Sequence, residues 1–185
     1  MTAQVRRIYV EKKEGFDIEA RNLCQDLRDN LGISELKEVR ILNRYDVSGL
    51  TDEEYLLARN TIFSEPPVDK VYDEVYDFHQ EGIDRVFAME YLPGQYDQRA
   101  DSASQCIQIL TRKEKPVVKA AKVFLLKGHI SDEAFATIKH YCINPVDSRE
   151  ASLEKPLTLD EDLDLPNQVE LVRGFTTMTT EELQD

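Results

Sequence analysis

The chain has 185 residues, of which 41% are hydrophobic and 32% charged, a composition typical of globular proteins in water. This length is enough for one domain or two small ones. Lys and Arg total 23 against 36 Asp and Glu, so the formal net charge is −13, which disfavours nucleic acid and anionic membrane surfaces as partners.

The N-terminal residues and the cysteine content predict a cytoplasmic protein. The opening MTAQVRRIYVEKKEGF lacks the apolar stretch of a signal peptide, and no apolar run approaches the roughly 20 residues that span a bilayer. Cys24, Cys106 and Cys142 are odd in number and widely spaced, which fits a reducing compartment better than a disulfide framework.

A strand and then a helix are predicted first. Val5 to Val10 is rich in β-forming residues and ends at the charged turn EKKEG. Apolar residues then recur at helical spacing, and Gly32 follows where a left-handed C-terminal cap is expected. Val39 to Tyr45 predicts the next strand. The apolar helix positions are Ala20, Leu23, Cys24, Leu27 and Leu31.

A second helix and a third strand complete this half of the chain. Thr51 to Glu54 is a capping-box sequence, in which the hydroxyl and the carboxylate can bind free amides at a helix start. Pro66-Pro67 stops the helix, and Val68 to Phe78 predicts a strand. The helix is expected to carry Tyr55, Ala58 and Ile62 inward.

The same order of elements is predicted again in the second half. Val86 to Tyr91 predicts a strand, and a polar stretch leads from it into a helix. Pro116 to Leu126 predicts another strand, and Ser131 to Glu133 predicts the start of a further helix. The inward positions expected on these two helices are Ala103, Ile107 and Leu110, then Phe135, Ile138 and Tyr141.

Matching motifs recur in the same order in the two halves. We therefore predict an α+β fold of duplicated strand-helix-strand-helix units, residues 1–82 and 83–150, with antiparallel sheets packed as a pseudo-dimer within one domain, residues 1–150. The matches are Gly49 and Thr51-Asp52-Glu53 with Gly128 and Ser131-Asp132-Glu133, and Pro67-Val68-Asp69 with Pro145-Val146-Asp147.

Residues 151–185 differ in character from the rest of the chain. The stretch ASLEKPLTLDEDLDLPNQ is acidic, contains two prolines and shows little periodicity, so it predicts an extended acidic linker. Thr179 to Leu183 is another capping box with almost no helix after it. We therefore expect a linker and the start of a next segment here, within a longer protein.

No catalytic, cofactor-binding or metal-binding residues are predicted. The three histidines lack ligand spacing, so solvent-facing positions are the simpler interpretation for His79, His129 and His140. Buried packing is expected of Cys24 and Cys106. The seven glycines form no phosphate-binding pattern, and the acidic run at residues 160–162 lacks calcium-loop spacing.

The stretch YLPGQYDQRADSASQC, residues 91–106, is the strongest candidate for a contact surface. Pro93-Gly94 predicts a turn, and one aspartate can cap the helix that follows. Capping does not explain the whole polar series, so we expect contacts to protein or to a ligand. The equivalent joint in the first half is the plain charged turn EKKEGFDIEAR. The candidate residues are Gln95, Asp97, Gln98, Arg99, Asp101 and Ser102.

Four stretches occur in the order of a known family. Besides residues 91–106 they are RILNRYDV, FSEPPVD and INPVDSREAS, at 40–47, 63–69 and 143–152. Together they resemble the N-terminal region of large-type phosphoribosylformylglycinamidine synthase, and VRGFTTMTTEEL, at 172–183, is similar to the start of that family's next segment.

The resemblance implies a role in purine biosynthesis. Enzymes of that family convert formylglycinamide ribonucleotide to formylglycinamidine ribonucleotide with ATP, magnesium and ammonia, and a C-terminal glutaminase domain releases the ammonia from glutamine. Their N-terminal region resembles two fused copies of a small accessory subunit and packs against the synthase core and the glutaminase. The resemblance implies that this part alone is inactive and binds no cofactor.

Two other functions remain open from the sequence. One is a stand-alone ferredoxin-like regulatory domain that binds a small metabolite through Gln95 to Asp101. The other is an independent small enzyme, which ranks last because the sequence shows no acid-base or nucleophile constellation. The fold alone does not separate an assembly domain from a regulator.

Overall fold

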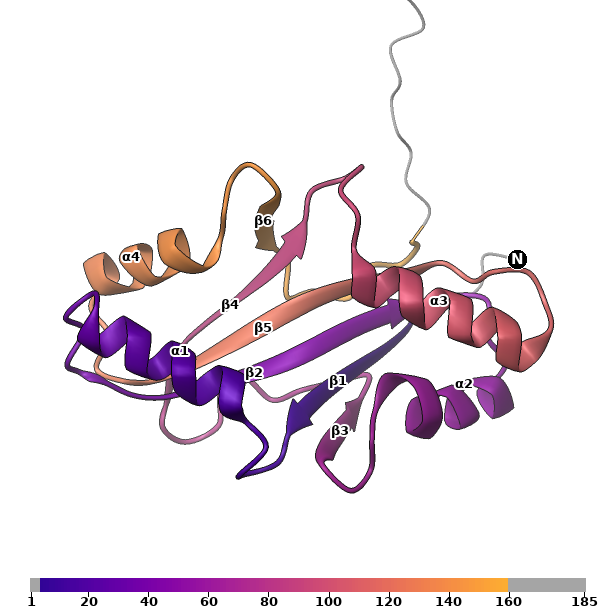
Figure 1. Ribbon diagram of the computed structural model, residues 1–185, viewed down its shortest axis with the longest axis horizontal. Coiled ribbons are helices and arrows are strands. Elements are labelled where there is room, and N and C mark those ends of the chain that lie inside the picture. The colour runs from indigo at the N-terminus through magenta and orange to yellow at the C-terminus, as the bar shows by residue number, and fades with distance from the viewer. Residues whose placement is uncertain (1–3, 160–185) are drawn as a thin grey trace, which may run out of the picture.

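The computed structural model describes residues 4–159, which form an open sheet of six strands and four α-helices (Figure 1). The strands are β1 (Arg6–Lys12), β2 (Leu36–Val47), β3 (Asp69–Asp73), β4 (Ile83–Tyr91), β5 (Val118–Gly128) and β6 (Ser148–Ala151). The helices are α1 (Ile18–Asp29), α2 (Asp52–Ala58), α3 (Gln98–Thr111) and α4 (Asp132–Cys142), and a π-helical turn, Arg59–Phe63, follows α2.

The predicted α+β class is confirmed, but all strands lie in one antiparallel sheet and not in separate sheets packed against each other, as was expected. The strand order is β3-β1-β2-β5-β4-β6, so the two halves of the chain meet where β2 pairs with β5. Leu42 lies opposite Val123 near the middle of this pairing. Each half has the element order strand, helix, strand, helix, strand. From the centre of the sheet outward, the strands are β2, β1 and β3 in the first half and β5, β4 and β6 in the second, so corresponding strands lie at corresponding places on the two sides.

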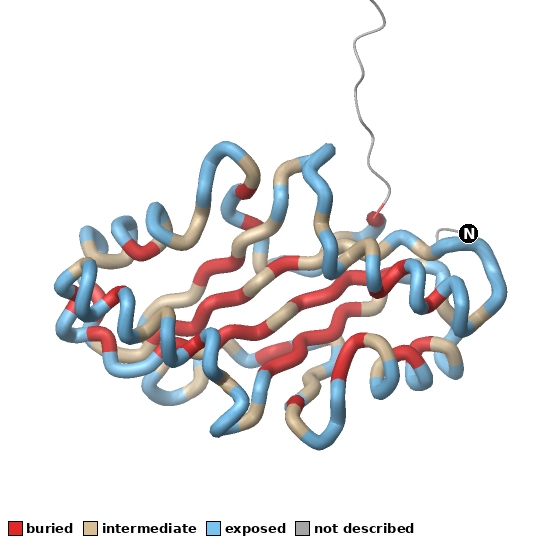
Figure 2. Tube along the Cα trace, viewed as in Figure 1, coloured by how far each residue is buried: buried red, intermediate tan, exposed pale blue. Residues whose placement is uncertain are grey.

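All four helices cover one face of the sheet, where two core clusters lie (Figures 1 and 2). In the first cluster Leu27 of α1 and Ile138 of α4 pack on Phe87 and Phe124, whose stacked rings lie 4.7 Å apart. The second cluster joins α2 and α3 above β1 and β2. Both clusters contain residues from both halves, so neither half can bury its own apolar surface alone.

The opposite face of the sheet carries no helix and is covered by irregular segments. Its core contains Leu42, Val123 and Leu125, each fully buried. Tyr76 and Phe78, from the connection between β3 and β4, pack there against other aromatic rings. The chain that follows β6 also crosses this face. We call this the helix-free face.

Local signals at the helix ends are confirmed. In the capping box of α2, Glu54 N donates to Thr51 Oγ1 at 3.2 Å and Thr51 N donates to Glu54 Oε2 at 2.9 Å. Ser131 caps α4 by accepting from Ala134 N, and Gly32 has the expected positive φ of 68°. These features need only a few neighbouring residues, which is why the sequence predicts them well.

One predicted strand boundary and two predicted core positions are wrong. The third strand ends at Asp73 and not at Phe78, because Glu74 takes a φ of +62° and turns the chain, which leaves Val75 78% exposed. Leu110 and Tyr141 are also exposed. On α4 the inward position after Ile138 is Cys142, which packs against the first cluster at the i+4 spacing.

The second motif match between the halves is displaced by one residue. Asp69 N donates to Glu65 O at 2.9 Å, and Ser148 N donates to Asn144 O at 2.8 Å. In both turns the last side chain also accepts from the first amide. The equivalent turns are therefore Glu65 to Asp69 and Asn144 to Ser148, so Pro66, and not Pro67, corresponds to Pro145.

The last strand, β6, ends at Ala151, next to the predicted end of the second unit at residue 150. The acidic run at 160–162 and the capping box at Thr179 lie outside the described residues. None of the helices between residues 4 and 159 has the length and apolar character that crossing a bilayer requires.

Candidate docking surface

The joint between β4 and α3 is a tight turn tied to a neighbouring strand. Gln95 N donates to Leu92 O at 3.0 Å, and Gly94 between them has a φ of +86°, as the third residue of a type II turn requires. Leu92 N donates to Asp147 O at 2.9 Å, just before β6. The polar series that follows is therefore held on a fixed backbone.

Asp97 is the N-cap of α3. Its Oδ1 accepts from Arg99 N at 2.9 Å and from Ala100 N at 3.0 Å, which satisfies two free amides at the helix start. Asp97 therefore has a structural role, as capping predicts for one of the two aspartates.

We expect Asp97→Ala to lower the free energy of unfolding by about 1 kcal/mol, the usual cost of removing a helix N-cap. Asp97→Asn keeps an acceptor oxygen and should retain most of that stability. Urea unfolding followed by circular dichroism measures both variants. Equal stability of the alanine variant and the unmodified chain would contradict the capping role.

Asp101 is enclosed by donors from its own surroundings. Its carboxylate accepts from Lys115 Nζ at 2.6 Å, Gln105 Nε2 at 2.7 Å and the Tyr96 hydroxyl at 3.1 Å. The hydrogen bond from Lys115 is the main reason that the pKa of Asp101 lies below its usual value. Asp101 therefore orders the joint.

The other four candidate residues take little part in hydrogen bonds within the joint. Arg99 Nη1 makes a long contact of 3.5 Å to the Tyr45 hydroxyl, and the Arg99 side chain is exposed. Gln95, Gln98 and Ser102 are exposed, and within residues 4–159 their side chains make no hydrogen bond. The structure thus separates the six candidates into residues that build the joint and residues left available for a partner.

Two hollows flank the N-terminus of α3. One of about 560 Å³ lies between the turn and the start of β5, and one of about 160 Å³ lies beside Gln98 and Arg99. Exposed apolar side chains border this region, with Tyr91 and Val117 both 44% exposed. The surface therefore combines free polar groups with apolar contact area.

The joint between β1 and α1 was predicted to be a plain charged turn, and the structure shows a hollow beside it. The hollow has a volume of about 670 Å³, and its lining includes Asn43 and Phe16, which is 54% exposed. Asn43 Oδ1 is buried and accepts no hydrogen bond from the described residues. The sequence signal that points to this region is an apolar Phe16 within an otherwise charged turn.

The histidines and cysteines occupy positions without catalytic geometry. His79, His129 and His140 are all exposed, as predicted. Burial raises the pKa of Cys142 to about 11, so this thiol is protonated at neutral pH. Cys106 is exposed, contrary to the expectation of buried packing, because α3 turns Ala103 and Ile107 toward the sheet.

In residues 4–159 no group of three or more histidine, cysteine or acidic side chains is arranged to hold a metal ion. Comparison with known proteins finds no family model, no curated protein and no solved structure that matches this chain.

Proposed function

We propose that this chain is a non-catalytic assembly domain of a large-type phosphoribosylformylglycinamidine synthase. Its partners are the synthase core and the glutaminase domain of the same enzyme, which hold the ATP, the magnesium and the reacting groups. The enzyme is a cytoplasmic ligase that uses glutamine as the amide donor in purine biosynthesis, and this domain supports its assembly.

The symmetry of the strand order is the observation that carries this proposal. Two copies of one unit fused into a pseudo-dimer would give two halves with the same element order, joined at a central strand pair. The order β3-β1-β2-β5-β4-β6 has this property. It is consistent with the two fused accessory-subunit copies that the resemblance implies.

The places of the four family-like stretches add support. FSEPPVD and INPVDSREAS contain the two turns with equivalent hydrogen bonds, before β3 and β6. RILNRYDV lies in β2, which pairs across the centre of the sheet. The fourth stretch forms the joint with free polar groups beside exposed apolar side chains, a combination found at protein interfaces.

The test uses the enzyme that contains this chain together with its synthase and glutaminase domains. We expect Arg99→Ala to lower glutamine-dependent synthesis several-fold and to leave ammonia-dependent synthesis unchanged, because the variant weakens docking and not the chemistry. The chain should remain folded, since Arg99 is exposed and makes only one long contact within it. Arg28→Ala, an exposed arginine at the end of α1, is the matched control.

Three results would contradict the proposal. The first is a coding sequence without synthase and glutaminase domains. The second is equal glutamine-dependent synthesis in the two arginine variants. The third is thermal stabilisation of the chain alone by glutamine, ATP or the ribonucleotide, since a bound ligand stabilises the folded state; that result would favour the ferredoxin-like regulator.

A further inference from the structure

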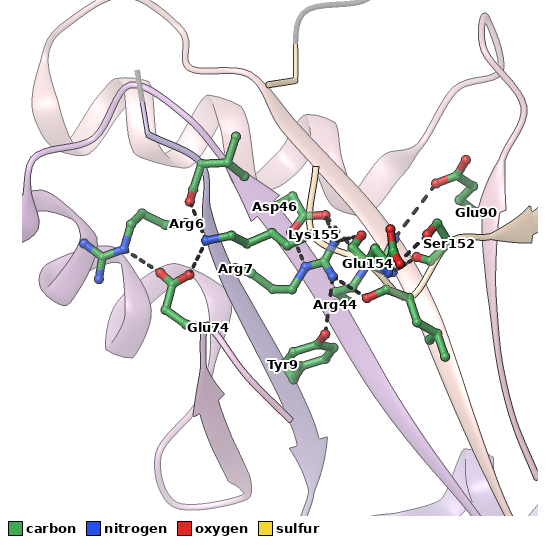
Figure 3. A network of polar contacts seen from close by, with 12 residues as sticks. Arg6, Arg7, Tyr9, Arg44, Asp46, Glu74, Glu90, Ser152, Glu154 and Lys155 are labelled. Atoms are coloured by element: carbon green, nitrogen blue, oxygen red, sulfur yellow. Dashed lines mark hydrogen bonds and ion pairs between the residues drawn. The ribbon is translucent and has the colours of Figure 1, made fainter. Parts of the chain in front are cut away.

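Residues 152–155, which we call the strap, cross from β6 at one edge of the sheet toward β1 near the other (Figure 3). The strap follows the second half of the chain, yet its hydrogen-bond partners Arg7, Arg44 and Glu74 belong to the first half. It therefore connects the end of one half to the helix-free face of the other.

Arg7 is the central residue of this contact and is only 1% exposed. Its Nε and Nη2 donate to the two carboxylate oxygens of Asp46 at 2.6 and 2.7 Å. Its remaining donors reach Leu153 O at 2.8 Å, Glu154 O at 3.2 Å and the Tyr9 hydroxyl at 3.5 Å. All five N–H groups of the guanidinium are thus used, two of them by strap carbonyl oxygens.

Arg44 adds a second guanidinium to the same place. Its Nη1 donates to Ser152 O at 2.6 Å, while its Nε lies 3.7 Å from Asp46. Burial, followed by repulsion from Arg7, lowers the pKa of Arg44. Two buried cations therefore share one buried carboxylate, and Arg44 Nη2 also lies 4.0 Å from the partly exposed carboxylate of Glu90 (Figure 3). The negative ends of three successive peptide carbonyls add to these two acids in offsetting the positive charge.

Lys155, the last residue of the strap, binds it to Val5, directly before β1, and to Glu74. Its Nζ donates to Glu74 Oε2 at 2.7 Å and to Val5 O at 3.1 Å. Glu74 also accepts from Arg6 Nε at 2.7 Å. The two cations outweigh the effect of burial and lower the pKa of Glu74 below its ordinary value, so this carboxylate is charged at neutral pH.

The strap is held by its main chain more than by its side chains. Ser152 and Glu154 are exposed, while their carbonyl oxygens accept from the buried arginines. On the same face of the second half, the middle of β4 and β5 carries the apolar side chains of Val86, Val123 and Leu125. The buried cluster of Arg7, Arg44 and Asp46 therefore comes from β1 and β2, and Glu90 of β4 borders it, 4.0 Å from Arg44 Nη2 (Figure 3).

We propose that the Arg7, Arg44 and Asp46 cluster is a binding site for the main chain of an extended peptide, and that residues 152–155 occupy it in cis. Three backbone carbonyls supply most of the recognition, and two strap side chains add to it: Lys155 binds Glu74 and Val5 O, and Leu153 packs against the core of the helix-free face. By seating the strap on the first half, the site fastens the end of the second half and sets the direction in which the chain leaves the sheet. This inference does not depend on the proposed enzyme.

The test is cleavage of the full chain by a glutamate-specific protease at the Glu154–Lys155 bond, followed by mass spectrometry. Cleavage requires the strap to leave the sheet, so its rate reports the open fraction. We expect Arg44→Met and Glu74→Gln each to raise the rate about tenfold, because the first removes a charged donor to Ser152 O and the second removes the negative charge that pairs with Lys155. Leu157→Ala, which alters a side chain that is 94% exposed, should stay within about twofold.

Each variant's rate is divided by the cleavage rate of a blocked peptide with the same residues 150–158, which corrects for protease preference. Cleavage within α4, after Glu133, should be unchanged if the variants remain folded. An unchanged rate in Arg44→Met and Glu74→Gln would overturn the site. An increase in Leu157→Ala as large as theirs would also overturn the site, because the rate would then not depend on the contacts of Arg44 and Glu74. If Arg44→Met fails to fold, Glu74→Gln still decides the question.

Discussion

Asp46→Ala is expected to lower the free energy of unfolding by about 3 to 5 kcal/mol, the usual cost of breaking a buried ion pair from one side. The variant leaves the guanidiniums of Arg7 and Arg44, which are 1% and 5% exposed, without the carboxylate between them. Their charges would repel each other in surroundings that water enters poorly. Urea unfolding at neutral pH measures the effect.

The matched control for this prediction is an exposed pair in the same sheet. Glu38 on β2 accepts from Lys127 at 2.8 Å, and Glu38→Ala should cost less than about 1 kcal/mol, because solvent already screens that pair. Arg44→Met should also be tolerated better than Asp46→Ala, since it leaves Asp46 with both hydrogen bonds from Arg7. Similar losses in Asp46→Ala and Glu38→Ala would show that the buried pair is not as enclosed as its burial indicates.

Gly128→Ala is the second large expected effect, a loss of about 3 kcal/mol or more, from backbone strain and overpacking together. Gly128 has a φ of +150°, and a Cβ there would lie 2.2 Å from Glu35 O. The obstacle is a backbone carbonyl, which cannot rotate aside as a side chain can. Thermal and urea unfolding measure the loss.

Gly49→Ala separates strain from collision. Gly49 also has a positive φ, of +84°, but a Cβ there meets no atom within 4 Å. We expect this variant to lose only about 1 to 2 kcal/mol, the cost of a left-handed conformation in an L-residue. If both alanine variants lose the same amount, the close approach of Gly128 to Glu35 is not the cause. The two glycines match in the sequence, and only the structure distinguishes their surroundings.

The candidate surface could be located from the sequence but not resolved into roles. The six polar residues after β4 lie at one joint, as predicted. Asp97 and Asp101 look alike in the sequence, yet one caps α3 and the other binds Lys115, which is 14 residues away. A distant lysine reaches that carboxylate only because the chain returns after α3, and no local pattern encodes this return.

The sequence by itself determined the order of elements, the caps of α2 and α4, and the repetition of motifs between the halves. These features depend on residues within one or two turns of each other, where periodicity and hydrogen-bonding capacity act directly. The α+β class follows from them, because alternating short helices and strands have few ways to bury their apolar faces.

Only the tertiary structure decided that the halves share one sheet and that β2 pairs with β5. It also decided that Arg7 finds Asp46, 39 residues away, and that both arginines bind the backbone at 152–154, more than 100 residues away. In the sequence Arg7 is a charged residue within an ordinary strand. Its burial is stable only because distant segments bring a carboxylate and carbonyl oxygens to it together, and a linear pattern does not contain that coincidence.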